Sequence, residues 1–74
     1  MVDMMQIEQQ VVEAMRNLGA TKDSSTKTIG EIVKESNRPY GLVSNSLMSL
    51  VHGERVKRVP KKDGPAGYYL SDKK

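Results

Sequence analysis

The sequence contains no cysteine, no tryptophan and no phenylalanine, and it has a single histidine, His52. Without cysteine, neither a disulfide bond nor a thiolate metal site can form. One histidine cannot supply the ligand set of a zinc site, and no Ser/His/Asp arrangement can be built around it. The composition therefore predicts a protein without a metal or a cofactor, and it argues against an enzyme.

Long apolar runs are also missing. The longest run is far shorter than the ~20 residues that a membrane-spanning helix needs, and the N-terminus lacks the basic flank and apolar stretch of a signal peptide. A chain of 74 residues has room for one small core and no deep cleft, because chains of this size bury only about 60% of their unfolded surface. We expect one domain over residues 1–74, located in the cytoplasm, with no membrane contact and no small-molecule ligand.

The first apolar pattern predicts a helix over residues 3–18 that ends at Gly19. Met5 and Val12 project about a third of a turn away from the centre of its apolar face. They either widen the core face of a small domain or form the contact of a two-fold homodimer through this helix. The apolar face itself follows a three-four spacing and consists of Met4, Ile7, Val11, Ala14 and Leu18.

Two shorter helices are predicted after a polar loop. Thr28 and Glu31 have the spacing of a capping box, which indicates a helix over residues 29–36. Pro39 favours the first turn of a third helix, over residues 40–52. The apolar side of this third helix consists of Val43, Leu47, Leu50 and Val51.

Beyond Gly53 the pattern changes from helical spacing to alternation, which predicts a β-hairpin over residues 55–71. The stretch "KKDGPAG" supplies turn residues, so we expect a flexible tip over residues 61–67. Pro60 cannot donate a ladder hydrogen bond and is expected at a strand end or on an edge.

Charge is divided unevenly between the two halves of the chain. Residues 1–37 hold four Lys or Arg against six Asp or Glu, whereas residues 38–74 hold eight against three. This asymmetry makes the second half the candidate surface for a polyanion. Within the predicted hairpin, five cations fall in eight positions: Arg55, Lys57, Arg58, Lys61 and Lys62.

The order of helix, short helix, tight turn, helix and basic hairpin resembles that of winged helix-turn-helix proteins. The stretches "VSNSLMSLVHGERVKRVP" and "DGPAGYYLS" are similar to those of MarR-like transcription regulators. The resemblance implies an α+β fold in which three helices pack on a small antiparallel β-hairpin wing. It also implies a DNA-binding regulator of transcription in which the helix over residues 40–52 is the recognition helix and the hairpin is the wing.

By that resemblance, the side of residues 40–52 opposite the apolar stripe meets the major groove of double-stranded DNA. Asn45 is the candidate for reading adenine, because its amide can pair with both the N6 and N7 edges of that base. No Arg or Lys lies on this side, so the cations favour phosphate attachment over base reading. The predicted DNA-binding residues are Arg38, Tyr40, Ser44, Asn45, Arg55, Lys57, Arg58, Lys61 and Lys62.

Two alternative functions remain open from the sequence. A winged helix also serves as a module for binding a protein or ribosomal RNA, which an exposed patch of Tyr40, Met48 and Tyr69 would favour. The stretch "PYGLVSNSLMSL" also resembles the recognition helix of Zα domains, which bind left-handed DNA. Here Ser44 stands where that family has Asn and Met48 where it has Tyr, so the main contacts of that family are missing.

Overall fold

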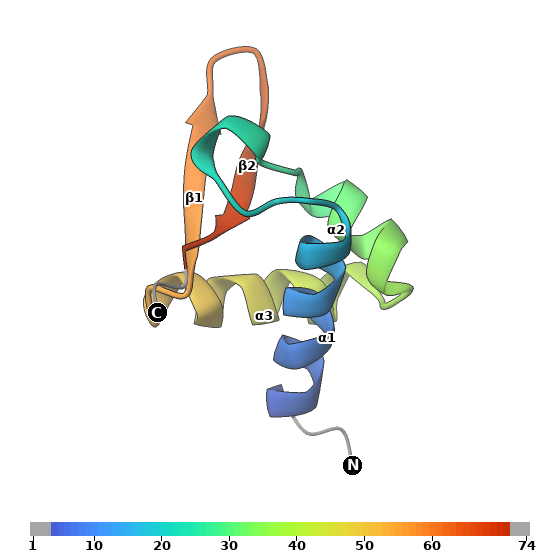
Figure 1. Ribbon diagram of the computed structural model, residues 1–74. Coiled ribbons are helices and arrows are strands. Elements are labelled where there is room, and N and C mark those ends of the chain that lie inside the picture. Colours follow the sequence, from blue (N-terminus) through green and yellow to red (C-terminus); the bar gives the residue numbers. More distant parts are fainter. Residues whose placement is uncertain (1–3, 72–74) are drawn as a thin grey trace.

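The computed structural model describes residues 4–71 as three helices that pack together beside a hairpin (Figure 1). The hairpin rises from the C-terminal end of the third helix, and the first helix crosses in front of that helix in this view. The elements are α1 (Met4–Asn17), the 3₁₀ turn η1 (Asp23–Ser25), α2 (Ile29–Ser36), α3 (Tyr40–His52), β1 (Val56–Lys61) and β2 (Gly64–Leu70).

Helix α1 supplies much of the core, and its buried face is wider than the predicted stripe. Gly19 ends the helical region in the left-handed conformation, with φ of 79°, as its lack of a side chain permits. Val12 is only 6% exposed and belongs to the core, so of the two alternatives predicted for it, the wider core face is the one that the structure shows. The side chain of Met5 lies outside what the structure describes. The core consists of Ile7, Val11, Val12, Ala14, Met15, Ala20, Ile32, Val43, Leu47, Leu50, Val56 and Leu70.

The predicted capping box at the start of α2 is present. The backbone N–H of Thr28 donates to Glu31 Oε1 at 2.9 Å, and the backbone N–H of Glu31 donates to Thr28 Oγ1 at 3.3 Å. The first of these hydrogen bonds is the main cause that lowers the pKa of the Glu31 carboxyl, with smaller contributions from the Thr28 hydroxyl and the nearby Lys27. Asn37 then ends α2 in the left-handed conformation, with φ of 58°.

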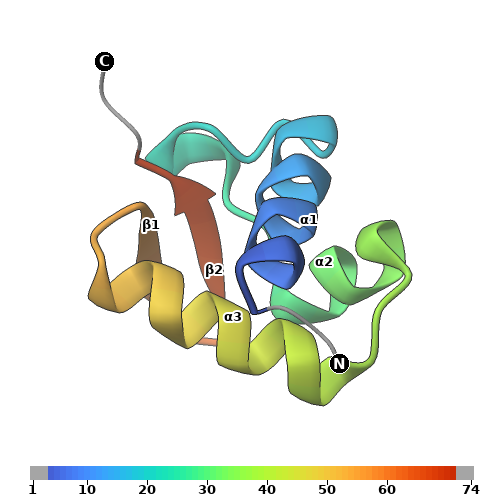
Figure 2. The ribbon, with the colours of Figure 1, turned by 90° about the horizontal axis from the view of Figure 1, so that it is seen from below.

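Helix α3 lies along one side of the molecule (Figure 2). Helices α1 and α2 pack against its inner side, and no other element within residues 4–71 covers its outer side. The left-handed residue after α3 is Glu54, with φ of 64°, whereas the preceding Gly53 has a φ of −85°. Within residues 4–71, no helix combines the length and apolar character needed to cross a bilayer.

The hairpin is antiparallel and is fixed to the helical part through a third, very short strand segment. Val56 pairs with Leu70 at its base, and the register shifts between Val59 and Lys61, beside Pro60. Lys27 bridges the free edge of β2 through two backbone hydrogen bonds with Tyr68, at 2.8 and 3.0 Å. The turn at the tip contains only residues 62–63, so the predicted tip over residues 61–67 was too long, because β2 already starts at Gly64.

Candidate nucleic-acid interface

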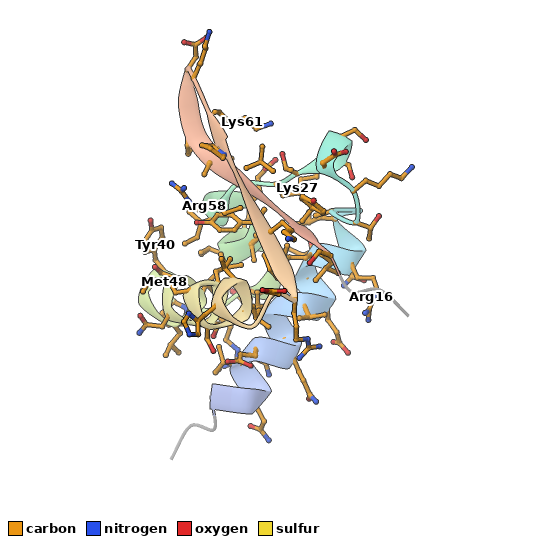
Figure 3. The ribbon with its side chains drawn as sticks, turned by 90° about the vertical axis from the view of Figure 1, so that its left-hand side faces the viewer. Arg16, Lys27, Tyr40, Met48, Arg58 and Lys61 are labelled. Atoms are coloured by element: carbon orange, nitrogen blue, oxygen red, sulfur yellow. The ribbon has the colours of Figure 1, made fainter. Side chains whose placement is uncertain are left out.

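The outer side of α3 exposes large side chains that nothing else in residues 4–71 covers. Tyr40 is 60% exposed and Met48 is 67% exposed, and both lie on the same side of the molecule (Figure 3). Ser44 is half-buried between them along the helix, while Asn45 is exposed. With about 100° of rotation per residue, Asn45 lies about 60° from Met48, on the flank opposite Ser44. The predicted contact side of the helix is therefore open to a partner.

A groove runs between this side of α3 and the hairpin. Arg58 on β1 pairs with Tyr68 on β2, and directly paired residues of an antiparallel sheet point to the same face. Both line a hollow of about 420 Å³ together with residues of α3. This front groove is lined by Ser44, Met48, Val51, His52, Arg58 and Tyr68. Its lining combines the apolar side chains of Met48 and Val51 with the cation of Arg58.

The cations of the hairpin do not share one face. Arg58 and Lys61 leave opposite sides of the hairpin in Figure 3. The stem of Lys61 turns toward Gly67, since its Cε lies 3.4 Å from the position that a Cβ on Gly67 would take. Lys62 lies in the exposed turn at the tip. The hairpin thus carries positive charge on both of its faces, from Arg58 in the middle of β1 and from Lys61 next to the turn.

The two cations at the base of the hairpin lie away from the front groove. Arg55 and Lys57 line a different hollow, together with Tyr69. Alternation along β1 explains this separation, because Lys57 and Arg58 are neighbours and must point to opposite faces. Arg55 also borders the outer face of α1 beside Glu13. The structure therefore separates these two predicted DNA contacts from the outer side of α3.

Arg38 also lies apart from the front groove. It precedes α3 and lines a small hollow with Glu13 of α1 and Glu35 of α2. These two carboxylates lower the local positive potential. Of the nine predicted residues, six remain on or beside the outer side of α3 and the hairpin tip: Tyr40, Ser44, Asn45, Arg58, Lys61 and Lys62.

Sequence reasoning missed two residues of the front groove, Val51 and Tyr68. Tyr68 was predicted only as a strand residue and Val51 only as part of the apolar stripe, yet both line the groove. His52, in contrast, belongs to the side of residues 40–52 that was predicted to meet the major groove, and it lines the front groove. The cross-strand pair of Arg58 and Tyr68 follows once the turn is placed at residues 62–63, so the register of the hairpin was the missing signal.

Tyr40, Met48 and Tyr69 do not form one patch. Tyr40 and Met48 lie on the outer side of α3, whereas Tyr69 lines the hollow on the other face of the hairpin, with Arg55 and Lys57.

Within the part of the chain that the structure describes, no three His, Asp or Glu residues come together in a way that could hold a metal ion.

No family model matches the chain, and no curated protein matches it in sequence. Solved structures of similar shape include the apo form of the Zα domain of zebrafish PKZ, with a TM-score of 0.79 at 20% identity over 93% of this chain and 97% of that one. This is a likeness of fold. The chain has a winged helix-turn-helix fold.

Two bacterial structures have the same winged helix-turn-helix arrangement. The DNA-binding fragment of TubR from Clostridium botulinum matches with a TM-score of 0.77 at 15% identity, over 96% of this chain and 85% of that one. A predicted DNA-binding protein of Ralstonia eutropha JMP134 matches with a TM-score of 0.74 at 17% identity and the same coverages. The predicted α+β class, with three helices and an antiparallel wing, is confirmed. The narrower resemblance to MarR-like regulators stays a prediction.

Proposed function

We propose that this winged helix binds double-stranded DNA, with α3 in the major groove and the hairpin tip on the phosphate backbone. The observation that carries the proposal is the front groove, in which the uncovered side of α3 and the cationic hairpin face one space. The fold also supports it, because similar structures include proteins described as DNA-binding. A role in transcription regulation and a cytoplasmic location remain predictions that go beyond this support.

In this proposal, α3 binds the major groove of DNA through its shape and through uncharged polar side chains. A B-form major groove is about 12 Å wide and accepts an α-helix. Ser44 and Asn45 would meet base edges there, and Tyr40 would lie near a phosphate at the start of the helix. Because none of these three side chains carries a charge, we expect weak discrimination between sequences and a large share of affinity from the hairpin.

The hairpin tip suits the space between two phosphate strands. Arg58 and Lys61 point to opposite faces of the hairpin; Arg58 lies in the middle of β1 and faces the front groove, whereas Lys61 is next to the turn and Lys62 lies in it. A minor groove is about 6 Å wide and 7.5 Å deep, so only the tip can enter it. Lys57 lines the hollow on the opposite face from Arg58 and lies about 13 Å from Lys61 along the strand, so it lies outside this contact.

Charge-matched variants test the proposal by fluorescence anisotropy with a labelled random-sequence duplex at low salt. Arg58→Ala should weaken binding about tenfold, because a hydrogen-bonded charge pair is lost. Arg16→Ala removes the same charge from the opposite side of the molecule (Figure 3) and should leave the affinity nearly unchanged. Equal effects of the two variants would contradict the proposed contact surface.

The alternative role as a protein-binding or ribosomal-RNA-binding module has one supporting observation. Tyr40 and Met48 are both mostly exposed, although Tyr69, the third residue of the patch that would favour this role, lies on another face. Titration of the same protein against duplex DNA, single strands and structured RNA separates these functions. Affinity for RNA alone, without affinity for duplex DNA, would favour the alternative.

Left-handed DNA is the other alternative, and the likeness to the Zα domain supports it at the level of fold alone. The two α3 positions that this alternative depends on hold Ser44 and Met48, a hydroxyl and a thioether in place of an amide and a phenol. A duplex held in the left-handed form by cytosine modification tests this alternative. We expect it to bind no more tightly than the same sequence in B form.

Val12 no longer supports the predicted homodimer, because its side chain is buried in the core of its own chain. Met5 is the remaining candidate contact. Sedimentation equilibrium of the isolated protein distinguishes a monomer of 8.2 kDa from a dimer of twice that mass. A dimer would place two recognition helices on half-sites about 34–36 Å apart.

A further inference from the structure

A second and larger groove lies on the reverse face of the hairpin base, away from the front groove. Its volume is about 790 Å³, which falls in the range of about 300–1,000 Å³ that is typical of sites for small organic ligands. The duplex proposal does not use it. This rear groove is lined by Thr21, Gly53, Glu54, Arg55, Lys57, Tyr69, Leu70 and Ser71.

The walls of the rear groove come from three segments that hydrogen bonds hold together. The end of β2 is joined to the segment after α1, because the Leu70 N–H donates to the Ala20 carbonyl at 2.8 Å. It is also joined to the segment after α3, because the Ser71 N–H donates to the Arg55 carbonyl at 3.0 Å and the Ser71 hydroxyl donates to the Glu54 carbonyl at 2.9 Å. The groove is therefore formed before any ligand arrives.

The chemistry of the lining combines an aromatic ring with cations. Lys57 and Tyr69 are direct cross-strand partners, so their side chains share one face. Thr21, an exposed residue, adds a hydroxyl-bearing side chain to the lining. Glu54 is the one acid among the described residues of this lining, against two cations, Arg55 and Lys57. A half-buried ring beside a lysine is the arrangement that binds a base by stacking and its phosphate by charge.

We infer that the rear groove binds single-stranded nucleic acid, with a base on the ring of Tyr69 and the adjoining phosphate on Lys57. The occupant is a single strand and not a second duplex, because the groove is concave and of the size of one or two nucleotides. The convex surface of a duplex keeps its bases stacked inside and offers no ring to Tyr69. This site lies on the opposite face from Arg58, so strand and duplex can bind together.

Anisotropy with a labelled 12-residue oligothymidylate tests the inference on the full chain. Lys57→Glu should weaken strand binding at least about tenfold. The affinity of Lys57→Glu for a duplex should change no more than that of the control variant, Lys34→Glu. Lys34→Glu is the matched control, because it makes the same charge change at an exposed position of α2 that borders none of the grooves described here. Equal losses for the two variants would overturn the site.

Two variants of Tyr69 test the stacking separately. Tyr69→Phe keeps the ring and should keep the strand affinity, whereas Tyr69→Leu removes the ring and should lower it at least about fivefold. Because Tyr69 packs partly against the core, unfolding curves are recorded for both variants. If Tyr69→Leu does not fold, the comparison of Lys57→Glu with Lys34→Glu still decides the outcome.

Competition experiments distinguish this site from the proposed duplex site. Saturating unlabelled duplex should leave the labelled strand bound, and Arg58→Ala should weaken the duplex alone. Complete displacement of the strand by the duplex would show one shared surface and overturn the inference. Thymidine monophosphate that competes as well as the oligonucleotide would replace the strand with a small ligand and would also overturn it.

Discussion

Replacing Gly67 with alanine tests how the hairpin is fixed to the helical part of the fold. Gly67 is buried on β2, next to the point where Lys27 bridges Tyr68. A Cβ at this position would lie 2.5 Å from the Cβ of Thr26 and still closer to its hydroxyl oxygen. Real Cβ atoms do not approach so closely, so either the segment with Thr26 or strand β2 must move.

The cost of that movement follows from the contacts that it disturbs. Overpacking at a close contact destabilises by about 1–3 kcal/mol. The two backbone hydrogen bonds between Lys27 and Tyr68 contribute about 1 kcal/mol each if they break. Alanine also restricts the conformations of the unfolded chain more than glycine does, which stabilises the folded state by about 0.4–1 kcal/mol. The middle values of these contributions predict that Gly67→Ala lowers the free energy of unfolding by about 2 kcal/mol.

Urea unfolding followed by circular dichroism measures this loss. With a slope of about 1 kcal/mol per molar urea for so small a domain, the midpoint should fall by about 2 M. Gly41→Ala is the matched control, since a Cβ there meets nothing within 4 Å, and alanine in a helix should stabilise by up to about 1 kcal/mol. Thr26→Gly should partly restore Gly67→Ala, because it removes the blocking side chain. A Gly67→Ala protein as stable as the wild type would refute the reasoning.

Two further predictions concern the helices. The pKa of the Glu31 carboxyl is lowered in the folded protein, so its contribution to stability is fully present above the unfolded pKa of about 4.5 and is lost as pH falls through the lower folded value. When the stability of Glu31→Gln is measured against pH in the acid range, this part of the loss should be missing. A pH dependence of stability identical to that of the wild type would contradict the prediction. Leu47→Ala should destabilise the fold by about 2–5 kcal/mol, because Leu47 is buried in the core. Met48 is its exposed neighbour, and Met48→Ala should change the free energy of unfolding by less than about 0.5 kcal/mol. Comparable losses of stability in the two variants would contradict the orientation of α3.

The local parts of the fold could be predicted from the sequence. The capping box of Thr28 and Glu31 and the left-handed Gly19 depend on residues a few positions apart, so a short stretch determines them. The helix-turn-helix order followed from the same kind of pattern. The short 3₁₀ turn over Asp23–Ser25 was expected only as loop, because its polar residues form no apolar pattern.

Features that depend on packing between distant segments could not be predicted in this way. Val12 is buried because α1 contacts both other helices and β2 at once, which no single-helix pattern reveals. The alternation of Lys57 and Arg58 along a strand was readable from the sequence, but the face that turns toward α3 was not. The orientation of β1 places the five hairpin cations on different faces, whereas their closeness in the sequence had suggested one shared surface.

The salt dependence of duplex affinity tests the central claim most directly, namely that α3 and the hairpin tip together bind double-stranded DNA. Three phosphate contacts, from Arg58, Lys61 and Lys62, predict a slope of log affinity against log salt of about −2.7, or a loss of about 40-fold between about 50 and 200 mM salt. Replacing these three residues together with alanine should bring the slope close to zero. A wild-type slope near zero, or a slope that the triple variant leaves unchanged, would contradict the claim.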